Sequence, residues 1–443
     1  MLQKVLSTFF IVLFILSLVG VLLTKSIDRS DYKTKDYYLE TISDLENLEP
    51  NFSEGEFWQV GWSKVNATPE QPANLVGYAP RGKYEFVLDS SFVRVLVVGN
   101  GVQNIAILNY ELLIVHPYLA ERIKTSIENQ GLPIDFTYFT ATHTHSGIGG
   151  YIPGLMGKVA FGGYDEFIVE MLEQKTLEGL ESALASQDTA FINYQISQTD
   201  TLVYNRFIKG GQVDPFIRQL TFQKKSGERA AFLTYSAHPT TLAVKFMGLS
   251  GDYPHYLMEK LEDKMYDFAL FAAGVVGSQG PARTGNQPEH TEAFAEAVYQ
   301  QSIRNVKQIS PVSKEKIAYS KLPIALREAH YKLGENVRLN PWIFESAFGK
   351  SNAHFDVLLL GNTLLLSSSG EISGVFMKDW EALAKSRGLN LILTTFNGGY
   401  IGYITPDEYY DYDYHEARGM NWYGPYNGAY FNELINGLIL KSW

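Results

Sequence analysis

Two histidines separated by one residue stand out among the side chains that could do chemistry. His143 and His145 follow a run of apolar and β-branched residues at 135–141 that predicts a buried strand. Alternation along an extended chain would direct both imidazoles to one side. Neutral imidazoles are ligands for zinc and other transition metals. Taken alone, the pair is equally compatible with two inert, hydrogen-bonded histidines at a strand end.

Two further candidate ligands follow predicted strands elsewhere in the chain. His238 comes after a strand expected at 229–237, and Glu371 comes after a very apolar strand expected at 363–368. A lone histidine in such a place is more often a hydrogen-bonded loop residue. A carboxylate there could bind a metal as a hard oxygen ligand, or it could be an electrostatic partner for a following helix. The tyrosines and aspartates at 400–430 by themselves indicate an aromatic surface loop.

The composition excludes several classes of function. Of the 443 residues, 45% are hydrophobic, and 37 basic against 48 acidic residues give a net charge of −11. An acidic chain without a basic block lacks the positive surface that nucleic-acid binding requires. The sequence contains no cysteine, which excludes a thiol nucleophile and a cysteine-held metal cluster. The signatures G-x-S-x-G, G-x-x-x-x-G-K-[ST] and H-E-x-x-H are absent from it as well.

Strands and helices are mixed along the chain, and tight turns at Asn100-Gly101 and Gly361-Asn362 predict hairpins. The patterns predict strands at 92–99, 104–112, 135–141, 216–223, 229–237, 268–276, 357–360, 363–368 and 389–395, and helices at 117–129, 164–186, 253–266, 289–309 and up to 387. We therefore expect the α/β class: one large catalytic domain at 51–443, with layers of mixed β-sheet and flanking helices.

The amino terminus differs from this body. Residues 5–23 form an almost unbroken apolar run. As a helix it would span about 28 Å at ~1.5 Å per residue, roughly one bilayer core. We interpret 1–26 as a single-pass transmembrane helix and 27–50 as a polar tether. A cleaved signal peptide is the alternative, but it usually has a shorter apolar stretch and a small-residue cleavage site, which the exit LLTKS lacks.

The orientation of the anchor stays open. We expect a membrane protein whose catalytic domain is extracytoplasmic. Basic residues after the apolar run outnumber those before it, which by the positive-inside rule favours a cytoplasmic body instead; they are Lys25, Arg29, Lys33 and Lys35.

Six segments, taken together and in order, resemble the neutral ceramidase family, zinc amidases that cleave the acyl chain from sphingosine. The matching segments are Gly77-Tyr78-Ala79, THTHSGIGGY at 142–151, Asn205-Arg206, His238-Pro239 with Ser250-Gly251-Asp252 downstream, Gly370-Glu371, and YITPDEY at 403–409 with Tyr423-Gly424-Pro425 behind it. Such an ordered set is far more specific than any one motif.

The resemblance implies a zinc ion held by His143, His238, Glu371 and Tyr403. It also implies that His145 transfers protons and that Arg206 donates to the developing oxyanion. The implied partner is a lipid amide, N-acylsphingosine, which would be cleaved to sphingosine and a fatty acid at a membrane. No nucleic acid is expected as a partner, and the sequence does not indicate the oligomeric state.

Two departures from the family pattern fall in the expected substrate pocket. Gly280 stands where the family has a serine, which leaves Ser278 as the candidate substitute, and His415 stands where the family has a tyrosine. We expect the family's carboxy-terminal immunoglobulin-like domain to be lacking. Two alternatives therefore stay open: a zinc hydrolase of another amide or ester, and a catalytically silent lipid-binding relative.

Overall fold

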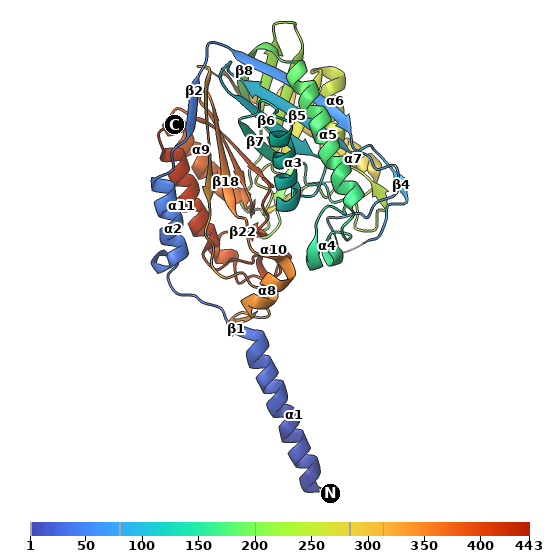
Figure 1. Cartoon of the computed structure of the whole chain (residues 1–443), viewed down its shortest axis with the longest axis vertical. Coiled ribbons are helices and arrows are strands. Elements are labelled where there is room, and N and C mark those ends of the chain that lie inside the picture. The colour runs from blue at the N-terminus through green and yellow to red at the C-terminus, as the bar shows by residue number, and fades with distance from the viewer. Residues whose placement is uncertain (1, 79–80, 200, 283–284, 313) are drawn as a thin grey trace.

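The computed structural model describes residues 2–78, 81–199, 201–282, 285–312 and 314–443, and its body has four layers in the order helix, sheet, sheet, helix (Figure 1). The expected α/β class with mixed sheets and flanking helices is confirmed. The apolar helix α1 (Leu2–Leu23) projects from one end of the body.

The larger sheet has nine strands in the described part of the chain, in the order β13-β11-β10-β8-β3-β5-β6-β7, with β15 paired to β8. The pairs β6–β7 and β11–β13 are parallel and the others are antiparallel. The strands are β3 (Trp58–Asn66), β5 (Phe92–Gly99), β6 (Asn104–Tyr110), β7 (Phe136–Ala141), β8 (Asp188–Gln198), β10 (Phe216–Lys224), β11 (Arg229–Tyr235), β13 (Phe268–Ala273) and β15 (Val306–Pro311).

The second sheet has five strands among the described residues and packs face to face on the first. Leu96 and Val98 of β5 lie in the core between the sheets, whereas Val95 and Val97 pack against helices on the other side. Burial on both faces explains why β5 is a continuous apolar run. The strands, in spatial order, are β2 (Asn51–Glu54), β16 (Lys316–Pro323), β18 (His354–Leu360), β19 (Thr363–Ser368) and β21 (Asn390–Thr395).

Helices cover the outer face of each sheet, and apolar side chains fill the space between each sheet and its helices. Those on the nine-stranded sheet are α3 (Pro117–Asn129), α5 (Glu166–Ala185), α6 (Asp252–Lys264) and α7 (Pro288–Arg304). Those on the five-stranded sheet are α2 (Asp36–Glu46), α9 (Met377–Ser386) and α11 (Asn427–Leu440). Shorter elements nearer to α1 are β1 (Thr24–Ser26), α4 (Gly154–Ala160), β17 (Val337–Leu339), α8 (Pro341–Phe348) and α10 (His415–Arg418).

The strands β3, β8 and β16 were not expected from the sequence, and two segments have a conformation other than the expected one. The helix expected at 289–309 ends at Arg304, and residues 306–311 form β15 because they pair with β8. The expected tether at 27–50 contains α2, a helix that packs against α11. Its buried Thr41 accepts a hydrogen bond from the backbone of Ala325 at 2.8 Å, so this part of the segment is fixed to the body.

Curvature of the nine-stranded sheet brings strands from opposite ends of its order together. Asn109 on β6 donates a hydrogen bond of 2.8 Å to the carbonyl of Phe271 on β13. Thr395 at the end of β21 donates to the carbonyl of Ala273 at 3.3 Å, which joins the second sheet to the same place. The carboxyl ends of β7, β13 and β21 therefore meet, and the candidate site lies there.

The helix α1 is exposed along its length. Among the described residues, one helix, with its apolar span at 3–23 and a mean hydropathy of 2.8, has the length and composition to cross a membrane. A signal sequence near the amino terminus would meet the same criterion.

Candidate metal centre

A turn after β7 sets the direction of the first histidine. His143 has a left-handed backbone with φ of 65°, not the extended conformation on which our expectation of alternating side chains depended. Its Nδ1 lies 2.7 Å from the carbonyl of Leu113, and its ring stacks on Phe396 with centroids 4.2 Å apart. When Nδ1–H is donated to that carbonyl, the lone pair of Nε2 is left to bind a cation.

Three imidazoles converge on one point, and we call His143, His145 and His238 the imidazole trio. Nε2 of His238 lies 3.1 Å from Nε2 of His143 and 2.9 Å from Nε2 of His145. The Nε2 atoms of His143 and His145 are 3.4 Å apart. Ligands at ~2.0–2.1 Å from a tetrahedral zinc ion are about 3.4 Å from one another. The spacing therefore fits three nitrogens around one cation, and these three residues could hold a metal ion.

Burial determines the protonation of two of these rings. It lowers the pKa of His145 and His238 well below the usual value of histidine, and the nearby His143 and Arg206 lower the pKa of both further. Both rings are therefore neutral near pH 7. Neutral imidazole is the form that binds metal.

Glu371 approaches the trio from the segment that follows β19 of the second sheet. One carboxylate oxygen, Oε1, accepts a hydrogen bond of 2.6 Å from the hydroxyl of Tyr400. The other, Oε2, lies 3.4 Å from Nε2 of His143 and is buried with no hydrogen-bond partner among the described residues. An unpaired buried oxygen is costly, and a cation at the trio would satisfy it.

Strand pairing places Tyr403 beside this carboxylate. The short strands β20 (Glu371–Ile372) and β22 (Tyr403–Ile404) are parallel, with Glu371 and Tyr403 directly opposite each other. Burial raises the pKa of Glu371, but the nearby His143 and the hydroxyls of Tyr400 and Tyr403 lower it more, so the carboxyl is ionised. Burial and Glu371 raise the pKa of Tyr403 well above its usual value.

Arg206 lies on the other side of His238. It follows β9 (Val203–Asn205), and its Nη1 is 3.3 Å from Nδ1 of His238. Its Nη2 forms an ion pair of 2.6 Å with Glu416, a buried residue on α10. The sequence analysis missed Glu416 and also Tyr400. Glu416 directly follows His415, which the sequence analysis did name. Tyr400 lies in the tyrosine-rich region at 400–430.

The residues at the two departures from the family pattern are not among those that converge on the trio. His415 is exposed at the start of α10. Ser278 is buried and its hydroxyl accepts a hydrogen bond of 2.7 Å from Ser373, which follows β20. A Cβ added at Gly280 would lie 2.7 Å from the ring of Tyr204, so this ring occupies the space of a side chain at 280.

The backbone at Gly77, in the first of the six segments that resemble the family, packs closely against His145 of the trio. Gly77 has a φ of 115°, and a Cβ there would lie 2.4 Å from Cα of His145. Only glycine allows this approach. The ring of Tyr78 lies 4.9 Å from that of His145 between centroids, and Ala79 lies outside the described residues.

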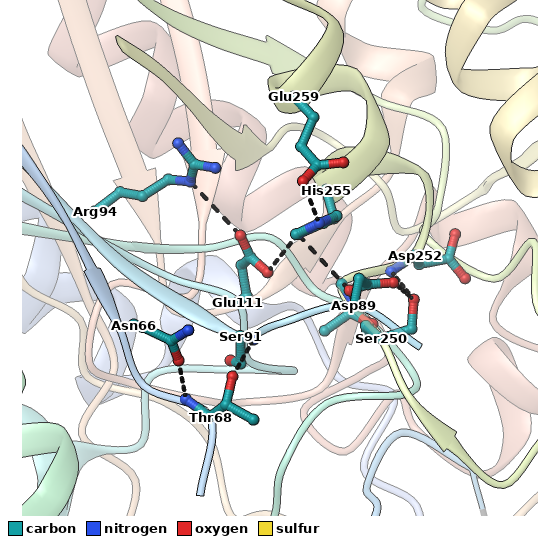
Figure 2. A network of polar contacts seen from close by, with 12 residues as sticks. Asn66, Thr68, Asp89, Ser91, Arg94, Glu111, Ser250, Asp252, His255 and Glu259 are labelled. Atoms are coloured by element: carbon teal, nitrogen blue, oxygen red, sulfur yellow. Dashed lines mark hydrogen bonds and ion pairs between the residues drawn. The ribbon is translucent and has the colours of Figure 1, made fainter. Parts of the chain in front are cut away.

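A second histidine-containing cluster lies apart from the trio (Figure 2). Nδ1 of His255 is 3.1 Å from Glu111 and 3.7 Å from Asp89, and Nε2 is 3.3 Å from Glu259. Glu111 also faces Arg94, at 3.5 Å from Nε. Burial lowers the pKa of His255, but Glu111 and the other carboxylates raise it more, to about 10. We call these five residues the His255 cluster.

Hydrogen bonds connect the two clusters. Asp89 accepts from the hydroxyl of Ser250 at 2.5 Å and from the backbone of Gly251 at 2.7 Å. The carbonyl of Ser250 in turn accepts from the hydroxyl of Thr144 at 2.7 Å. Because Thr144 separates two members of the trio, the His255 cluster helps to fix the loop that carries them.

Comparison with solved structures identifies the fold. The chain is similar to neutral ceramidase from Pseudomonas aeruginosa, with 16% identity and a TM-score of 0.71 over 87% of this chain and 74% of that one. It is similar to a ceramidase complexed with C2, with 15% identity and a TM-score of 0.71 over 87% of this chain and 75% of that one. Neither a family model nor a curated protein matches the sequence. The fold that the ordered motifs implied is confirmed.

Proposed function

We propose that this chain, which has the fold of neutral ceramidase, is a membrane-anchored, zinc-dependent hydrolase of N-acyl amide bonds in lipids. The proposal depends on one observation: three Nε2 atoms lie within 3.4 Å of one another, and the unpartnered Oε2 of Glu371 lies 3.4 Å from one of them. N-acylsphingosine is the proposed substrate, with sphingosine and a fatty acid as products.

The proposed zinc ligands are two imidazoles, a carboxylate and a phenol. Nε2 of His143 and of His238 and Oε2 of Glu371 supply three borderline or hard donors of the kind that zinc prefers. Tyr403 is the fourth, because it lies directly beside Glu371. Zinc bound there would supply Lewis acidity for the scissile carbonyl and would lower the pKa of water.

Two side chains of the site carry out the remaining proposed chemistry. His145 is the member of the trio that is not a proposed ligand; it is neutral and buried, so its free Nε2 can take a proton from the attacking water and pass it to the leaving amine. The guanidinium of Arg206 would donate hydrogen bonds to the oxyanion that develops on the carbonyl. Its ion pair with Glu416 keeps it oriented before substrate arrives.

A second candidate is a zinc hydrolase of a different amide or ester. The observation that favours it is the ring of Tyr204, which fills the space beside Gly280 where the family has a serine. Ser278, the candidate substitute, is buried and its hydroxyl accepts a hydrogen bond from Ser373. The metal ligands are unaffected by this change, whereas the substrate pocket has a different shape.

Metal analysis and a substrate panel test both candidates on the full-length protein in detergent. We expect about one equivalent of zinc per chain and chelator-sensitive hydrolysis of N-acylsphingosine that is lost in Glu371→Gln. Hydrolysis of other amides or esters without N-acylsphingosine turnover would support the second candidate. Less than about half an equivalent of zinc, with no turnover, would contradict both and would favour a catalytically silent lipid-binding protein.

A further inference from the structure

Hydrogen bonds fix the apolar helix α1 to the body. Its last residues lead into β1, which pairs antiparallel with β17. Asn340, the residue before α8, donates its backbone N–H to the carbonyl of Leu23 at 2.8 Å and its side-chain amide to that of Leu22 at 3.4 Å. The last carbonyls of a helix have no partner within it, and Asn340 satisfies two of them. The start of α8 is therefore held at the level where α1 ends.

Exposed apolar side chains gather around this junction. The short helices α4 and α8 pack against each other, and Figure 1 shows both at the end of the body nearest to α1. Six side chains on α4, on α8, and on β17 or the turn just before it are between 36% and 57% exposed. We call them the juxtamembrane face: Leu155, Val159, Leu333, Val337, Trp342 and Phe348. An exposed apolar patch of this kind commonly marks an interaction surface.

Continuity with α1 indicates what covers the juxtamembrane face. If α1 spans a bilayer, Leu22 and Leu23 mark the edge of its hydrocarbon core, and Asn340 binds at that edge. Trp342 lies two residues further on and is 54% exposed, and tryptophan prefers the interface between hydrocarbon and water. The exposed Lys158 and Lys350 are suited to lipid phosphates nearby.

A cavity extends from this face toward side chains that neighbour the proposed metal ligands. It has a volume of about 170 Å³, and Phe344 and Phe348 of α8 line it together with Pro153 before α4. Its wall also includes Tyr400, whose hydroxyl donates to Glu371, and Ile114, which follows the residue that accepts from His143. Mostly apolar walls of this kind suit a hydrocarbon chain.

We propose that the juxtamembrane face lies on the bilayer into which α1 inserts, and that the cavity takes an acyl chain of the substrate directly from that bilayer. The first half depends on α1 being retained as an anchor. The second half rests on the proposed function as a lipid amidase.

The absence of cysteine from the sequence permits a direct test of the first half. The full chain is reconstituted in phosphatidylcholine–phosphatidylserine vesicles with one nitroxide-labelled cysteine, in Trp342→Cys, Leu155→Cys or the control Phe191→Cys. Phe191 is 66% exposed and belongs to β8, a strand that Figure 1 shows at the end of the body away from α1. We expect the labels at 342 and 155 to be reached by oxygen and shielded from a water-soluble nickel complex. Equal access of the nickel complex to all three labels would overturn the membrane contact.

Hydrolysis of two substrates tests the second half. We compare Trp342→Glu with the matched Phe191→Glu, using a long-chain N-acyl amide in vesicles and a short-chain, water-soluble one. We expect Trp342→Glu alone to slow the vesicle reaction about tenfold, with the soluble reaction unchanged. An equal effect of both variants on the vesicle substrate would overturn the delivery of substrate from the bilayer. If the wild type cleaves neither substrate, the proposed function fails, while the nitroxide positions still decide the membrane contact.

Discussion

Two histidines of the imidazole trio, His145 and His238, and the histidine of the His255 cluster are all buried but differ in protonation. In the trio, the Nε2 atoms face one another, and burial lowers the pKa of His145 and His238. In the His255 cluster, each ring nitrogen faces a carboxylate, and the pKa of His255 is raised to about 10. Both clusters are buried, so the charge of the partner decides whether a histidine is neutral or protonated.

The difference in protonation also distinguishes two groups of residues that both have the spacing of a metal site. Asp89, Glu111 and His255 lie close enough to hold a metal ion, as do the three histidines of the trio. A protonated imidazole has no lone pair to donate, so a metal would have to displace the proton that Glu111 stabilises. We therefore expect metal at the trio and a proton at His255, and each prediction below tests that assignment.

Removing the carboxylate at the trio should have the largest effect. Glu371→Gln deletes a charged ligand, so we expect nearly all hydrolysis to be lost. Metal affinity should fall by more than the ~10–100-fold that loss of an outer-shell partner costs. Elemental analysis and amide hydrolysis measure both. The matched control is Glu259→Gln, which removes a 53% exposed carboxylate from the His255 cluster. Equal metal loss in both variants would contradict the assignment.

Removing the central carboxylate of the His255 cluster should affect stability instead. Glu111→Gln leaves Arg94 and His255 facing an uncharged buried amide, and breaking a buried ion pair costs about 3–5 kcal/mol. Urea unfolding measures this free energy, and Glu259→Gln should change it by only ~0–1 kcal/mol. The folded fraction of Glu111→Gln should keep its metal. Metal loss at unchanged stability would place the ion in the His255 cluster.

The two clusters should respond oppositely to pH. The pKa of His255 is about 10 in the folded state, so its stabilisation is present below the unfolded value of about 6.5 and is lost as pH rises toward 10. The free-energy difference between wild type and His255→Gln should therefore shrink by roughly 2–4 kcal/mol between pH 6.5 and 10.

The trio gives the opposite trend, because the pKa of His145 and of His238 is lowered by folding. Their contribution is present above pH ~6.5 and is lost as pH falls below it. Urea unfolding of metal-free protein from pH 4 to pH 10 measures both trends. A pH-independent difference between wild type and His255→Gln would show that His255 is not held protonated.

The smallest effect should come from the arginine–carboxylate pair at the trio. Glu416 faces Arg206 as Glu111 faces Arg94, but Arg206 is partly exposed, and the role proposed for it is in catalysis rather than in folding. Glu416→Gln should lower hydrolysis by about tenfold and leave zinc bound. His415→Ala, next to it on an exposed position, should change the rate less than about twofold. Steady-state kinetics with metal analysis distinguishes the two, and a larger effect of His415→Ala would contradict this ranking.

Local patterns in the sequence were sufficient for many core strands and helices, but not for the strands β3, β8 and β16. Strands such as Phe92–Gly99 and the helix Pro117–Asn129 end where apolar periodicity and turn residues predict. The strand Val306–Pro311 and the helix Asp36–Glu46 were not expected. Pairing with β8 and packing on α11 select these conformations, and neither partner is close in the sequence.

For the candidate site, too, the sequence indicates the residues and the tertiary structure decides their arrangement. Residue types and motif order single out His143, His238 and Glu371 as candidate ligands, and the ligand assignments themselves stay predictions. Only the tertiary structure places His238 at 3.1 Å and Glu371 at 3.4 Å from Nε2 of His143, through a left-handed turn and a curved sheet. The protonation of His255 likewise depends on carboxylates more than 100 residues away. Periodicity is a property of neighbouring residues, whereas distance and charge at a buried site depend on which distant strands pair.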